Sequence, residues 1–515
     1  FASRDLDAGA DEDIGAVQLG DPITKEPLMH LCLELNEMKL LTGMKDLGGG
    51  GLSCVVGELA LDGGFGAMVD LEKVHLKVDN MPPWEIWVSE SQERMMFTVT
   101  PENVDKVLAR CEAWDVEAVT IGEVISEKRN IVNYNGIEIL NLDLDFTTGG
   151  PVYKRPYNLP EYDIGKAAPL PKYPSDISKQ IIDVISQPEV ASKDWVIRQY
   201  DHEVRGKTVL KPIQGPIGKD VPGDSSVIKP VDDSWKGLAL TSDVNPYLME
   251  ANPYHGTMSA VEEVCRNLAS VGARIDSLAD CLCFGNPRRP DIMGQFRASC
   301  EALRDAATAV DVPYVSGNVS LYNETQDGAI PPTPVLMGIG LVKDIRKCVT
   351  SDMKNEGTIW IVGKTKEEMG ASLYYRTLGV SCPNVPVTDF EAFIPRMEQL
   401  IQAIENGEVV ACHDISTGGL ALSIIEMCMS GIGAKIELTS DLRADIELFS
   451  ETNGRWVVQV KPGFEKDFER RFDFAVKIGD VDDRMIFIKD GKEISNLDIE
   501  KLRNEWISPI WDRLA

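Results

Sequence analysis

An aspartate followed by four glycines is the stretch of this sequence best suited to chemistry. Asp46 and Leu47 precede the run Gly48 to Gly51, and residues 52–59 have the pattern of a helix. Free backbone N–H groups at a helix N-terminus, together with the helix dipole, favour an anion such as phosphate. Asp46 could hold a cation that the anion shares. In a plainer interpretation, the glycines only allow close packing and Asp46 caps the helix.

This stretch has a counterpart far downstream. Residues 413–421 read His-Asp-Ile-Ser-Thr-Gly-Gly-Leu-Ala, and Asp414 follows Asp46 by 368 positions (414 − 46). The same offset relates Glu58 to Glu426 in the helix-like run that follows. Solenoid repeats are about 20–50 residues long. An offset of this size therefore indicates a duplicated domain.

A second polar cluster is repeated as well. Residues 89–94 read Ser-Glu-Ser-Gln-Glu-Arg before an apolar run, and residues 450–455 read Ser-Glu-Thr-Asn-Gly-Arg before another, with an offset of 361 (450 − 89). Taken alone, a polar cluster between two strands could also be a plain surface turn.

Two further polar segments follow apolar runs in the middle of the chain. The run Ser277 to Phe284 carries Asp280 and ends in Gly-Asn-Pro, which is typical of a strand that enters a turn. Residues 313–324 predict a strand that opens into a polar glycine turn.

Alternating helices and strands must position these residues. The spacing of apolar residues predicts helices over 28–35, 101–113, 259–272 and 292–310. Strands are predicted over 74–78, 84–88, 95–99, 116–124, 195–200, 227–240, 333–342 and 358–362. The proline-rich residues 151–176 favour extended backbone and predict a linker.

Length and charge narrow the class of protein. A chain of 515 residues predicts about three domains. The net charge of −30 argues against nucleic acid or an anionic membrane as a partner. The longest apolar runs, such as Ala421 to Met429, are far too short to span a bilayer. The eleven cysteines are scattered, which favours reduced thiols in a cytoplasmic protein.

Several familiar motifs do not occur. The sequence contains no Gly-x-x-x-x-Gly-Lys-Ser/Thr loop, no Gly-x-Gly-x-x-Gly fingerprint and no nucleophile elbow. Its five histidines do not cluster along the chain, and we interpret them as structural. His255 is the best candidate for an exception, because of its predicted loop setting.

Taken together, five motifs resemble phosphoribosylformylglycinamidine synthase, in its small, separate-subunit form. The motifs stand in the order of that family from one end of the chain to the other. They are Val17-Gln18-Leu19-Gly20-Asp21-Pro22, Asp46 to Leu52, Glu90-Ser91-Gln92-Glu93-Arg94-Met95, Asp280 to Pro287 and Gly317 to Glu324. The parent superfamily of aminoimidazole ribonucleotide synthetase-like ATP enzymes shares the architecture but lacks the third and fifth motifs.

The resemblance implies an α/β (α+β) fold with a duplicated architecture. Residues 1–150 would be a first B domain, 151–174 a linker, 175–343 a ferredoxin-like second A domain, and 344–515 a second B domain. The first A domain of the family would lie outside this sequence. Because the catalytic histidine of the family and several ATP and metal ligands belong to that domain, we expect the fragment alone to be inactive.

The implied reaction uses ATP to activate the formamide oxygen of formylglycinamide ribonucleotide. Ammonia then displaces phosphate and gives the amidine, a step of de novo purine biosynthesis. Carried over from the family, Asp46 and Asn318 would bind Mg²⁺, and Asp280 and Gly317 would contact ATP. The residues expected to hold the ribonucleotide substrate are Gln18, Glu90, Ser91, Gln92 and Ser320. No residue of this chain is assigned a catalytic role.

The chain departs from the family pattern at several positions. Asn252 stands where the family usually has Asp, Cys283 where it has Asn, and glycine fills both positions 49 and 50, where it has an Ala. In the second copy, Ser416-Thr417 replace two glycines and residues 452–454 replace Ser-Gln-Glu. This asymmetry predicts one chemical site and a second site that is structural or holds a nucleotide non-productively.

The resemblance also implies partners, because no glutaminase-type cysteine elbow occurs in the sequence. Ammonia would come from a separate glutaminase subunit, with a small bridging subunit in the complex. Two alternatives remain at this stage. One is another ATP-dependent member of the superfamily, of the selenophosphate synthetase or thiamine-phosphate kinase type, and the other is a catalytically inactive nucleotide-binding fragment.

Overall fold

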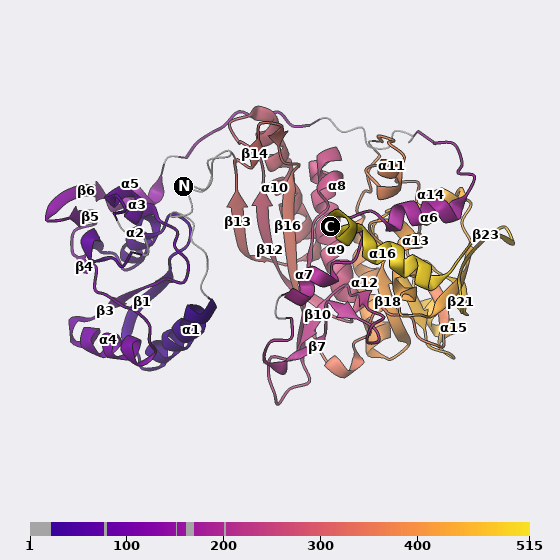
Figure 1. Ribbon diagram of the computed structural model, residues 1–515, viewed down its shortest axis with the longest axis horizontal. Helices are drawn as coiled ribbons and strands as arrows, with labels where there is room; N and C mark the ends of the chain where they lie inside the picture. The colour runs from indigo at the N-terminus through magenta and orange to yellow at the C-terminus, as the bar shows by residue number, and fades with distance from the viewer. Residues whose placement is uncertain are drawn as a thin grey trace. The chain divides into compact units, whose positions relative to one another are not determined.

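The computed structural model describes residues 22–76, 80–150, 152–160, 169–199, 202–382 and 384–514. The chain forms two compact units (Figure 1). Unit 1 comprises residues 1–154 with 325–327, and unit 2 comprises residues 155–324 with 328–515. Each unit is considered by itself.

Unit 1 alternates helices with short strands. Its elements are α1 (Pro22–Glu37), β1 (Leu41–Asp46), α2 (Leu52–Asp62), β2 (Gly66–Asp70), η2 (Leu71–Lys73), α3 (Pro83–Val88), β3 (Met95–Val99), η3 (Pro101–Asn103), α4 (Val104–Ala113), β4 (Gly122–Ile125), β5 (Arg129–Tyr134), β6 (Ile137–Asp143) and α5 (Leu144–Gly149).

The strands of unit 1 form two separate sheets. In one, β1 pairs with β3 antiparallel, which places Asp46 opposite Met95. The other has the order β4-β2-β5-β6. Helix α2 packs on β2, and α1 packs on α4 over a small apolar cluster that includes Leu31 and Leu35.

The first part of unit 2 is built around a six-stranded sheet of order β13-β12-β16-β11-β10-β7. Its elements are α6 (Ile177–Ile185), α7 (Asp194–Gln199), η4 (Val204–Gly206), β7 (Thr208–Leu210), β8 (Ile213–Gln214), β9 (Val221–Pro222), β10 (Ser226–Ile228), β11 (Gly237–Asp243), α8 (Pro246–Ala251), α9 (Pro253–Ser270), β12 (Arg274–Cys283), α10 (Pro290–Val310), β13 (Tyr314–Ser320), β14 (Glu324–Thr325), β15 (Gly328–Ala329) and β16 (Thr333–Val342).

Helix α9 is the central helix of unit 2. It begins at Pro253, directly after Asn252, whose side chain accepts a hydrogen bond from the backbone N–H of His255 at 3.0 Å. Asn252 therefore serves as the N-cap of this helix. Helix α9 packs against α10 and against strands of the two large sheets of unit 2, so most of its side chains are buried.

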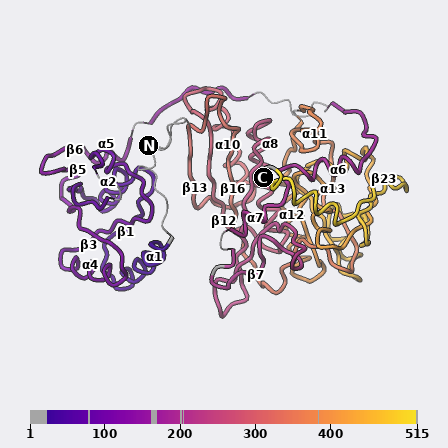
Figure 2. The backbone as a smooth tube through the Cα atoms, in the orientation of Figure 1, coloured from indigo at the N-terminus to yellow at the C-terminus, as the bar shows by residue number. Residues whose placement is uncertain are grey.

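The rest of unit 2 contains a seven-stranded sheet of order β18-β20-β17-β21-β19-β22-β23. Its elements are η5 (Ile345–Lys347), β17 (Thr358–Val362), α11 (Leu373–Thr377), α12 (Phe390–Glu405), β18 (Val409–Asp414), α13 (Gly419–Cys428), β19 (Gly433–Leu438), α14 (Ala444–Phe449), β20 (Trp456–Val460), α15 (Glu465–Arg471), β21 (Ala475–Asp482), β22 (Met485–Lys489), β23 (Lys492–Leu497) and α16 (Ile499–Leu514). Helices α6 and α16, which are far apart in sequence, pack on α13 (Figure 2).

The predicted mixed fold with helices and strands is confirmed, and so are the four predicted long helices. Two predicted strands are wrong. Residues 84–88 belong to helix α3, because Pro83 fixes a helical φ in the first turn and outweighs the strand preference of the aromatic residues. Residues 195–199 belong to helix α7, and Tyr200 lies outside the described residues.

A third predicted strand, over 74–78, does not form in its described part. Val74 to Leu76 follow the short helix η2 as irregular backbone, and residues 77 and 78 lie outside the described part of the chain. The predicted strand over 116–124 forms only from Gly122 onward. The described residues of the predicted linker, 152–160 and 169–176, have neither helix nor strand.

Two helices connect the longest strands of the six-stranded sheet. Its four longest strands and two helices follow the order β11-α9-β12-α10-β13-β16. A ferredoxin-like fold runs β-α-β-β-α-β. Here α10 connects β12 to β13 instead, and these two strands are parallel neighbours.

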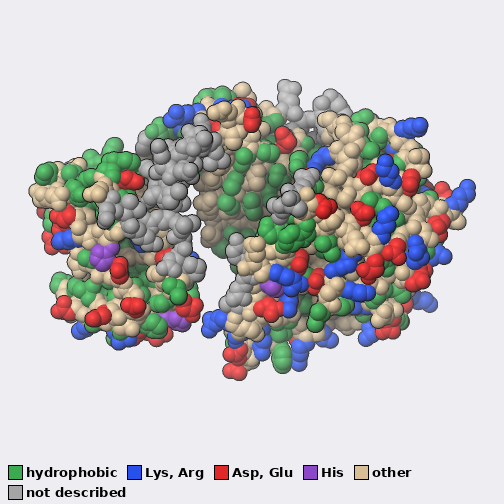
Figure 3. Space-filling model, in the orientation of Figure 1, with side chains coloured by type: hydrophobic (Ala, Val, Ile, Leu, Met, Phe, Trp, Pro, Cys, Tyr) green, Lys and Arg blue, Asp and Glu red, His purple; other side chains and the backbone are tan. Residues whose placement is uncertain are grey.

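Other properties of the described residues agree with the composition. All eleven cysteines are free. None of the described helices is long and apolar enough to cross a membrane. On the face of unit 2 seen in Figure 3, acidic and basic side chains are interspersed, which is not the basic surface that nucleic acid requires.

Candidate functional site

In unit 1, strand β1 delivers Asp46 to the start of the glycine turn. Its side chain is exposed, and the structure records no hydrogen bond or ion pair to its carboxylate from any described residue. Gly50 and Gly51 have φ angles of +76° and +54°, which favour glycine. The turn then continues into α2, an eleven-residue helix.

The segment that contains Glu90 and Ser91 lies directly against this turn. The backbone N–H of Gly50 donates to Glu90 Oε1 at 3.1 Å. A Cβ at Gly51 would lie 2.0 Å from the carbonyl oxygen of Ser89, so only glycine fits there. The structure therefore places the segment of Glu90 and Ser91 against the glycine turn that follows Asp46.

A half-buried arginine fixes this segment. Arg94 donates from Nε to the carbonyl oxygen of Ser91 at 2.9 Å and from Nη2 to that of Ser89 at 2.6 Å. Burial lowers the pKa of Arg94. Gln92 Nε2 donates to the carbonyl oxygen of Glu90 at 3.3 Å, and its side chain is exposed. Gln18, the remaining residue predicted for unit 1, lies outside the described residues.

In unit 2, the other predicted residues lie on the parallel strands β12 and β13. Asp280 is in register with Gly317, and Cys283 with Ser320. A Cβ at Gly317 would lie 3.0 Å from the Asp280 carboxylate, so the missing side chain leaves this carboxylate uncovered on that side. Burial raises the pKa of Asp280.

Other polar residues of the same strand pair lie next to Asp280 and Gly317. Asn318 Nδ2 donates to Cys281 Sγ at 3.5 Å, which leaves its amide oxygen available. The Ser320 hydroxyl donates to Asn323 Oδ1 at 3.4 Å. Strand β13 is the edge of its sheet, and residues 315–319 are exposed. Because side chains alternate along a strand, Asp280 and Gly317 lie on one face of this strand pair, and Asn318 and Ser320 lie on the other, with Cys281 and Cys283.

The second copy of the glycine turn, also in unit 2, repeats the hydrogen bonds of the first. The N–H of Gly418 donates to Glu451 at 2.8 Å, as that of Gly50 does to Glu90. Arg455 donates to the carbonyl oxygens of Thr452 at 2.8 Å and Ser450 at 2.6 Å. The predicted duplication therefore extends to individual hydrogen bonds.

The aspartate of the second copy has a different environment. Asp414 is buried, and Arg266 of helix α9 donates to its carboxylate from Nε at 3.1 Å. The same guanidinium contacts Glu262 and Glu263. Burial raises the pKa of Asp414, although the charge of Arg266 opposes this effect. A cation of the protein itself thus occupies the place beside this aspartate.

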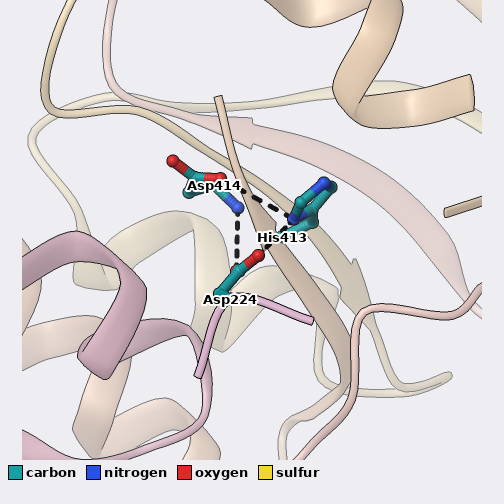
Figure 4. A group of neighbouring side chains, drawn as sticks. All are labelled: Asp224, His413 and Asp414. Atoms are coloured by element: carbon teal, nitrogen blue, oxygen red, sulfur yellow. Dashed lines mark hydrogen bonds and ion pairs between the residues drawn. The ribbon is translucent and has the colours of Figure 1, made fainter. Parts of the chain in front are cut away.

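His413 and Asp224 extend this ionic network (Figure 4). The imidazole lies between two carboxylates: Nδ1 faces Asp224, and Nε2 faces Glu426 at 3.0 Å. Burial alone would lower the pKa of His413, but the charges and hydrogen bonds of Asp224 and Glu426 raise it well above its usual value. The backbone N–H of Asp414 donates to the other oxygen of Asp224 at 3.1 Å.

Asp224, His413 and Asp414 also have the residue types of a metal site, with possible ligand atoms within 4.8 Å of one another. A metal-binding imidazole must be neutral. Here both ring nitrogens face carboxylates, which favours the protonated ring, and Arg266 already neutralises Asp414. We therefore interpret the group as an ionic network. Ser416 and Thr417 of the adjoining turn line a cavity of about 380 Å³.

His413 is the residue that sequence reasoning missed, whereas His255 was the expected exception. His255 lies in the first turn of α9, and burial lowers its pKa. The repeat held a usable signal. Lys45 and Glu58 form an ion pair at 2.6 Å in the first copy, and His413 and Glu426 occupy the equivalent positions in the second.

Comparison with known proteins gives the family. The model for the AIR synthase related protein, C-terminal domain, matches residues 1–135 and 357–489, and that for the N-terminal domain matches residues 222–342. The phosphoribosylformylglycinamidine synthase subunit PurL of Thermoplasma volcanium is 37% identical over 98% of this chain and 67% of its own length. The chain belongs to the phosphoribosylformylglycinamidine synthase family.

Other relatives agree with this membership. PurL of Thermococcus sibiricus is 40% identical over 98% of this chain and 70% of its own length. The solved structure of T. maritima PurL complexed with ATP has a TM-score of 0.65 at 23% identity, and covers 90% of this chain and 68% of that chain. That likeness shows the same fold.

Membership decides between the alternatives left open by the sequence. The chain is of the ATP-dependent carbon–nitrogen ligase class that makes formylglycinamidine ribonucleotide in purine biosynthesis. It is not of the selenophosphate synthetase or thiamine-phosphate kinase type. The chain spans about two thirds of the length of these relatives.

Proposed function

We propose that this chain binds ATP, Mg²⁺ and formylglycinamide ribonucleotide through the first copy of the glycine turn and the β12–β13 strand pair. The observation that carries the proposal is the exposure of the Asp46 carboxylate. Its carboxylate is exposed and has no partner among the described residues, whereas Asp414 of the second copy is buried against Arg266. The first copy is therefore the one that can accept a ligand.

The residues present fit a magnesium ion. Mg²⁺ prefers oxygen ligands, and each unit offers one: a carboxylate at Asp46 in unit 1 and an amide oxygen at Asn318 in unit 2. The amide nitrogen of Asn318 is engaged by Cys281, which orients its oxygen away from that thiol. When bound, Mg²⁺ would neutralise charge on the phosphates of ATP.

For the nucleotide, we propose Asp280 and Gly317. The absence of a side chain at Gly317 lets a ligand approach the Asp280 carboxylate on the exposed edge of the sheet. This carboxylate can accept hydrogen bonds from hydroxyl or amino groups of a nucleotide.

The ribonucleotide substrate needs donors for phosphate and ribose and acceptors for its hydroxyl groups. We propose that Gln18, Glu90, Ser91, Gln92 and Ser320 supply them. Glu90 is held in place by the Gly50 N–H, and Arg94 fixes the backbone of Ser91. These contacts orient the segment before a ligand binds, so less ordering is required on binding.

We propose a structural role for the second copy. In the described residues Arg266, His413, Asp414 and Asp224 neutralise one another within the protein. A nucleotide-bound cation at Asp414 would have to displace the guanidinium of Arg266. The second copy therefore stabilises unit 2 without turnover.

The remaining expectations belong to the same proposal. The chain divides into a first B domain (1–150), a linker (151–174), a second A domain (175–343) and a second B domain (344–515). It acts in the cytoplasm with a glutaminase subunit that supplies ammonia and a small bridging subunit. A solved structure of PurLQS from Thermotoga maritima, which has the fold of this chain, supports assembly with further subunits.

The test is Asp46→Asn, measured by Mg²⁺-dependent ATP binding in calorimetry and by ammonia-driven amidine formation in the assembled synthase. We expect at least a tenfold loss of Mg²⁺-dependent binding and about a 100-fold loss of turnover, because one charged ligand is removed. Asp105→Asn, on the exposed surface of α4, is the matched control and should change neither. Full activity of Asp46→Asn would contradict the proposal.

A further inference from the structure

Two cysteines lie next to each other on strand β12, which stands between β13 and β16 in the six-stranded sheet (Figure 1). The sulfur atoms of Cys281 and Cys283 are 3.8 Å apart, and both residues are free thiols. Among the described residues, no other pair of cysteine sulfurs lies within hydrogen-bonding distance. We call these two residues the β12 thiol pair.

The geometry of the strand accounts for the position of the pair. Side chains of residues i and i+2 of a strand lie on the same face of the sheet, and the residue between them lies on the other. Leu282, the residue between, is buried in the apolar cluster that includes residues of α9 and α10. The β12 thiol pair is half-buried on the face of the sheet that lies away from these helices.

Polar groups of the edge strand β13 lie beside the pair. Asn318 is in register with Cys281, and Ser320 is in register with Cys283. The side chain of Asn318 is exposed, and its amide nitrogen lies 3.5 Å from the sulfur of Cys281. The β12 thiol pair therefore borders the accessible edge of the sheet, where an ion from solvent can reach it.

The distance between the two sulfur atoms fits two thiolates bound to one zinc ion. Zinc binds a thiolate at about 2.3 Å in tetrahedral geometry, which places two ligating sulfurs about 3.8 Å apart. Zinc motifs usually have two to four residues between their cysteines. In an extended strand a single intervening residue is sufficient, because the side chains on either side of it share a face.

A disulfide does not fit the same pair. It requires Cβ atoms about 3.8 Å apart, whereas residues i and i+2 of a strand are separated by about 6.6–6.8 Å. Strand β12 cannot shorten here, because it pairs without interruption from Ala279 to Cys283 with β13 on one side and with β16 on the other. A shared metal ion requires no such movement of the backbone.

We propose that Cys281 and Cys283 form a binding site for one thiophilic divalent cation, zinc or its larger analogue cadmium. Each thiol releases its proton to the solvent as its sulfur–metal bond forms. Water completes the coordination on the accessible side. Mg²⁺ prefers oxygen ligands and does not compete for the two sulfurs. The site is therefore separate from the binding of Mg²⁺ and ATP proposed above.

Cadmium titration of the full chain tests the proposal, with a reductant that contains no thiol. The ultraviolet absorption of the cadmium–thiolate bond reports binding to sulfur. We expect a saturable signal at one cadmium ion per chain, which zinc abolishes by displacement. The group of Asp224, His413 and Asp414 contains no sulfur and does not contribute to this signal.

Two variants each remove one thiolate. Cys283→Asn introduces the residue that the family usually has at this position, and Cys281→Ser replaces the other sulfur by oxygen. We expect cadmium to bind each of them at least about tenfold more weakly, because oxygen is a poorer ligand for a soft cation. Either variant tests the proposal by itself if the other fails to fold.

Cys54→Ser is the matched control, since it removes an exposed thiol of unit 1 and should bind within twofold of the unchanged chain. Three results would overturn the proposal. The unchanged chain could give no saturable cadmium–thiolate signal, both variants of the β12 thiol pair could bind as the unchanged chain does, or Cys54→Ser could lose as much affinity as they do.

Discussion

The two copies of the glycine turn share their backbone and differ in what surrounds their aspartates. In both, a glycine N–H donates to a glutamate, and an arginine donates to the carbonyl oxygens of two residues in the following segment. Asp46 is exposed, whereas Asp414 is buried against Arg266. The duplication thus preserved a scaffold, and the neighbouring elements decide which copy can bind a ligand.

Helix α9 accounts for most of this difference. It carries Arg266 and packs on β18, the strand that ends in Asp414. An arginine that is 1% exposed must be neutralised, and Asp414, Glu262 and Glu263 do this. In the second copy, the guanidinium of Arg266 therefore takes the position beside the aspartate that a bound cation could take in the first copy.

The largest expected effect comes from removing that side chain. Arg266→Met leaves Asp414 and Glu262 buried without their cation, so we expect a loss of about 3–5 kcal/mol in the free energy of unfolding of unit 2. Denaturant unfolding of the full chain measures it. Arg304→Met, on the exposed face of α10, is the control and should change little. A loss below about 1 kcal/mol would show that the ion pairs of Arg266 do not stabilise the second copy.

The shared scaffold can be tested at its tightest contact. Gly51→Ala would place a Cβ 2.0 Å from the Ser89 carbonyl oxygen at a residue with φ of +54°. We expect a loss of about 2–3 kcal/mol in the stability of unit 1, because the segments must separate and the backbone is strained. Gly49→Ala is the matched control, since a Cβ there meets no atom within 4 Å. Equal melting temperatures for the two variants would argue against this close approach.

The buried glutamate of the second copy predicts a dependence on pH. Burial raises the pKa of Glu451 to about 7, above its usual 4.5. A raised folded-state pKa means that stability is full below about pH 4.5 and falls as pH rises through 7. Glu451→Gln lacks this loss, so its stability relative to the unchanged chain should improve by about 2 kcal/mol between pH 5 and pH 8. Denaturant unfolding at the two pH values measures the change.

The control for this comparison is Glu469→Gln, at an exposed residue of α15. It should follow the unchanged chain at both pH values. If Glu451→Gln did so as well, the carboxyl of Glu451 would not be the group whose ionisation costs stability.

The smallest effect is expected at Lys45, which we compare with its counterpart His413. Lys45 and Glu58 are 35% and 46% exposed, so Lys45→Met should cost at most about 1 kcal/mol. His413→Gln removes the positive partner of Asp224 and Glu426, whose side chains are only 3% and 15% exposed, and should cost at least twice as much. Thermal unfolding of both variants gives the ratio of the two losses in stability. A larger loss for Lys45→Met would contradict the assignment of the first copy as the ligand-binding one and of the second as structural.

The sequence by itself determined the duplication, the family resemblance and the long helices. These depend on local order: the offsets of 368 and 361, and apolar residues at helical spacing over 259–272 and 292–310. The sequence did not determine the structure of short aromatic segments. Residues 84–88 fit a strand by composition, and only Pro83 and the packing of Ile86 make them a helix.

Only the tertiary structure decided how the two copies differ. Arg266 lies 148 positions before Asp414, and Asp224 lies 189 before His413, so no local pattern could join them. Charge pairing and strand pairing depend on distances in the folded chain. The sequence contains the partners, but it does not show which of them lie close together.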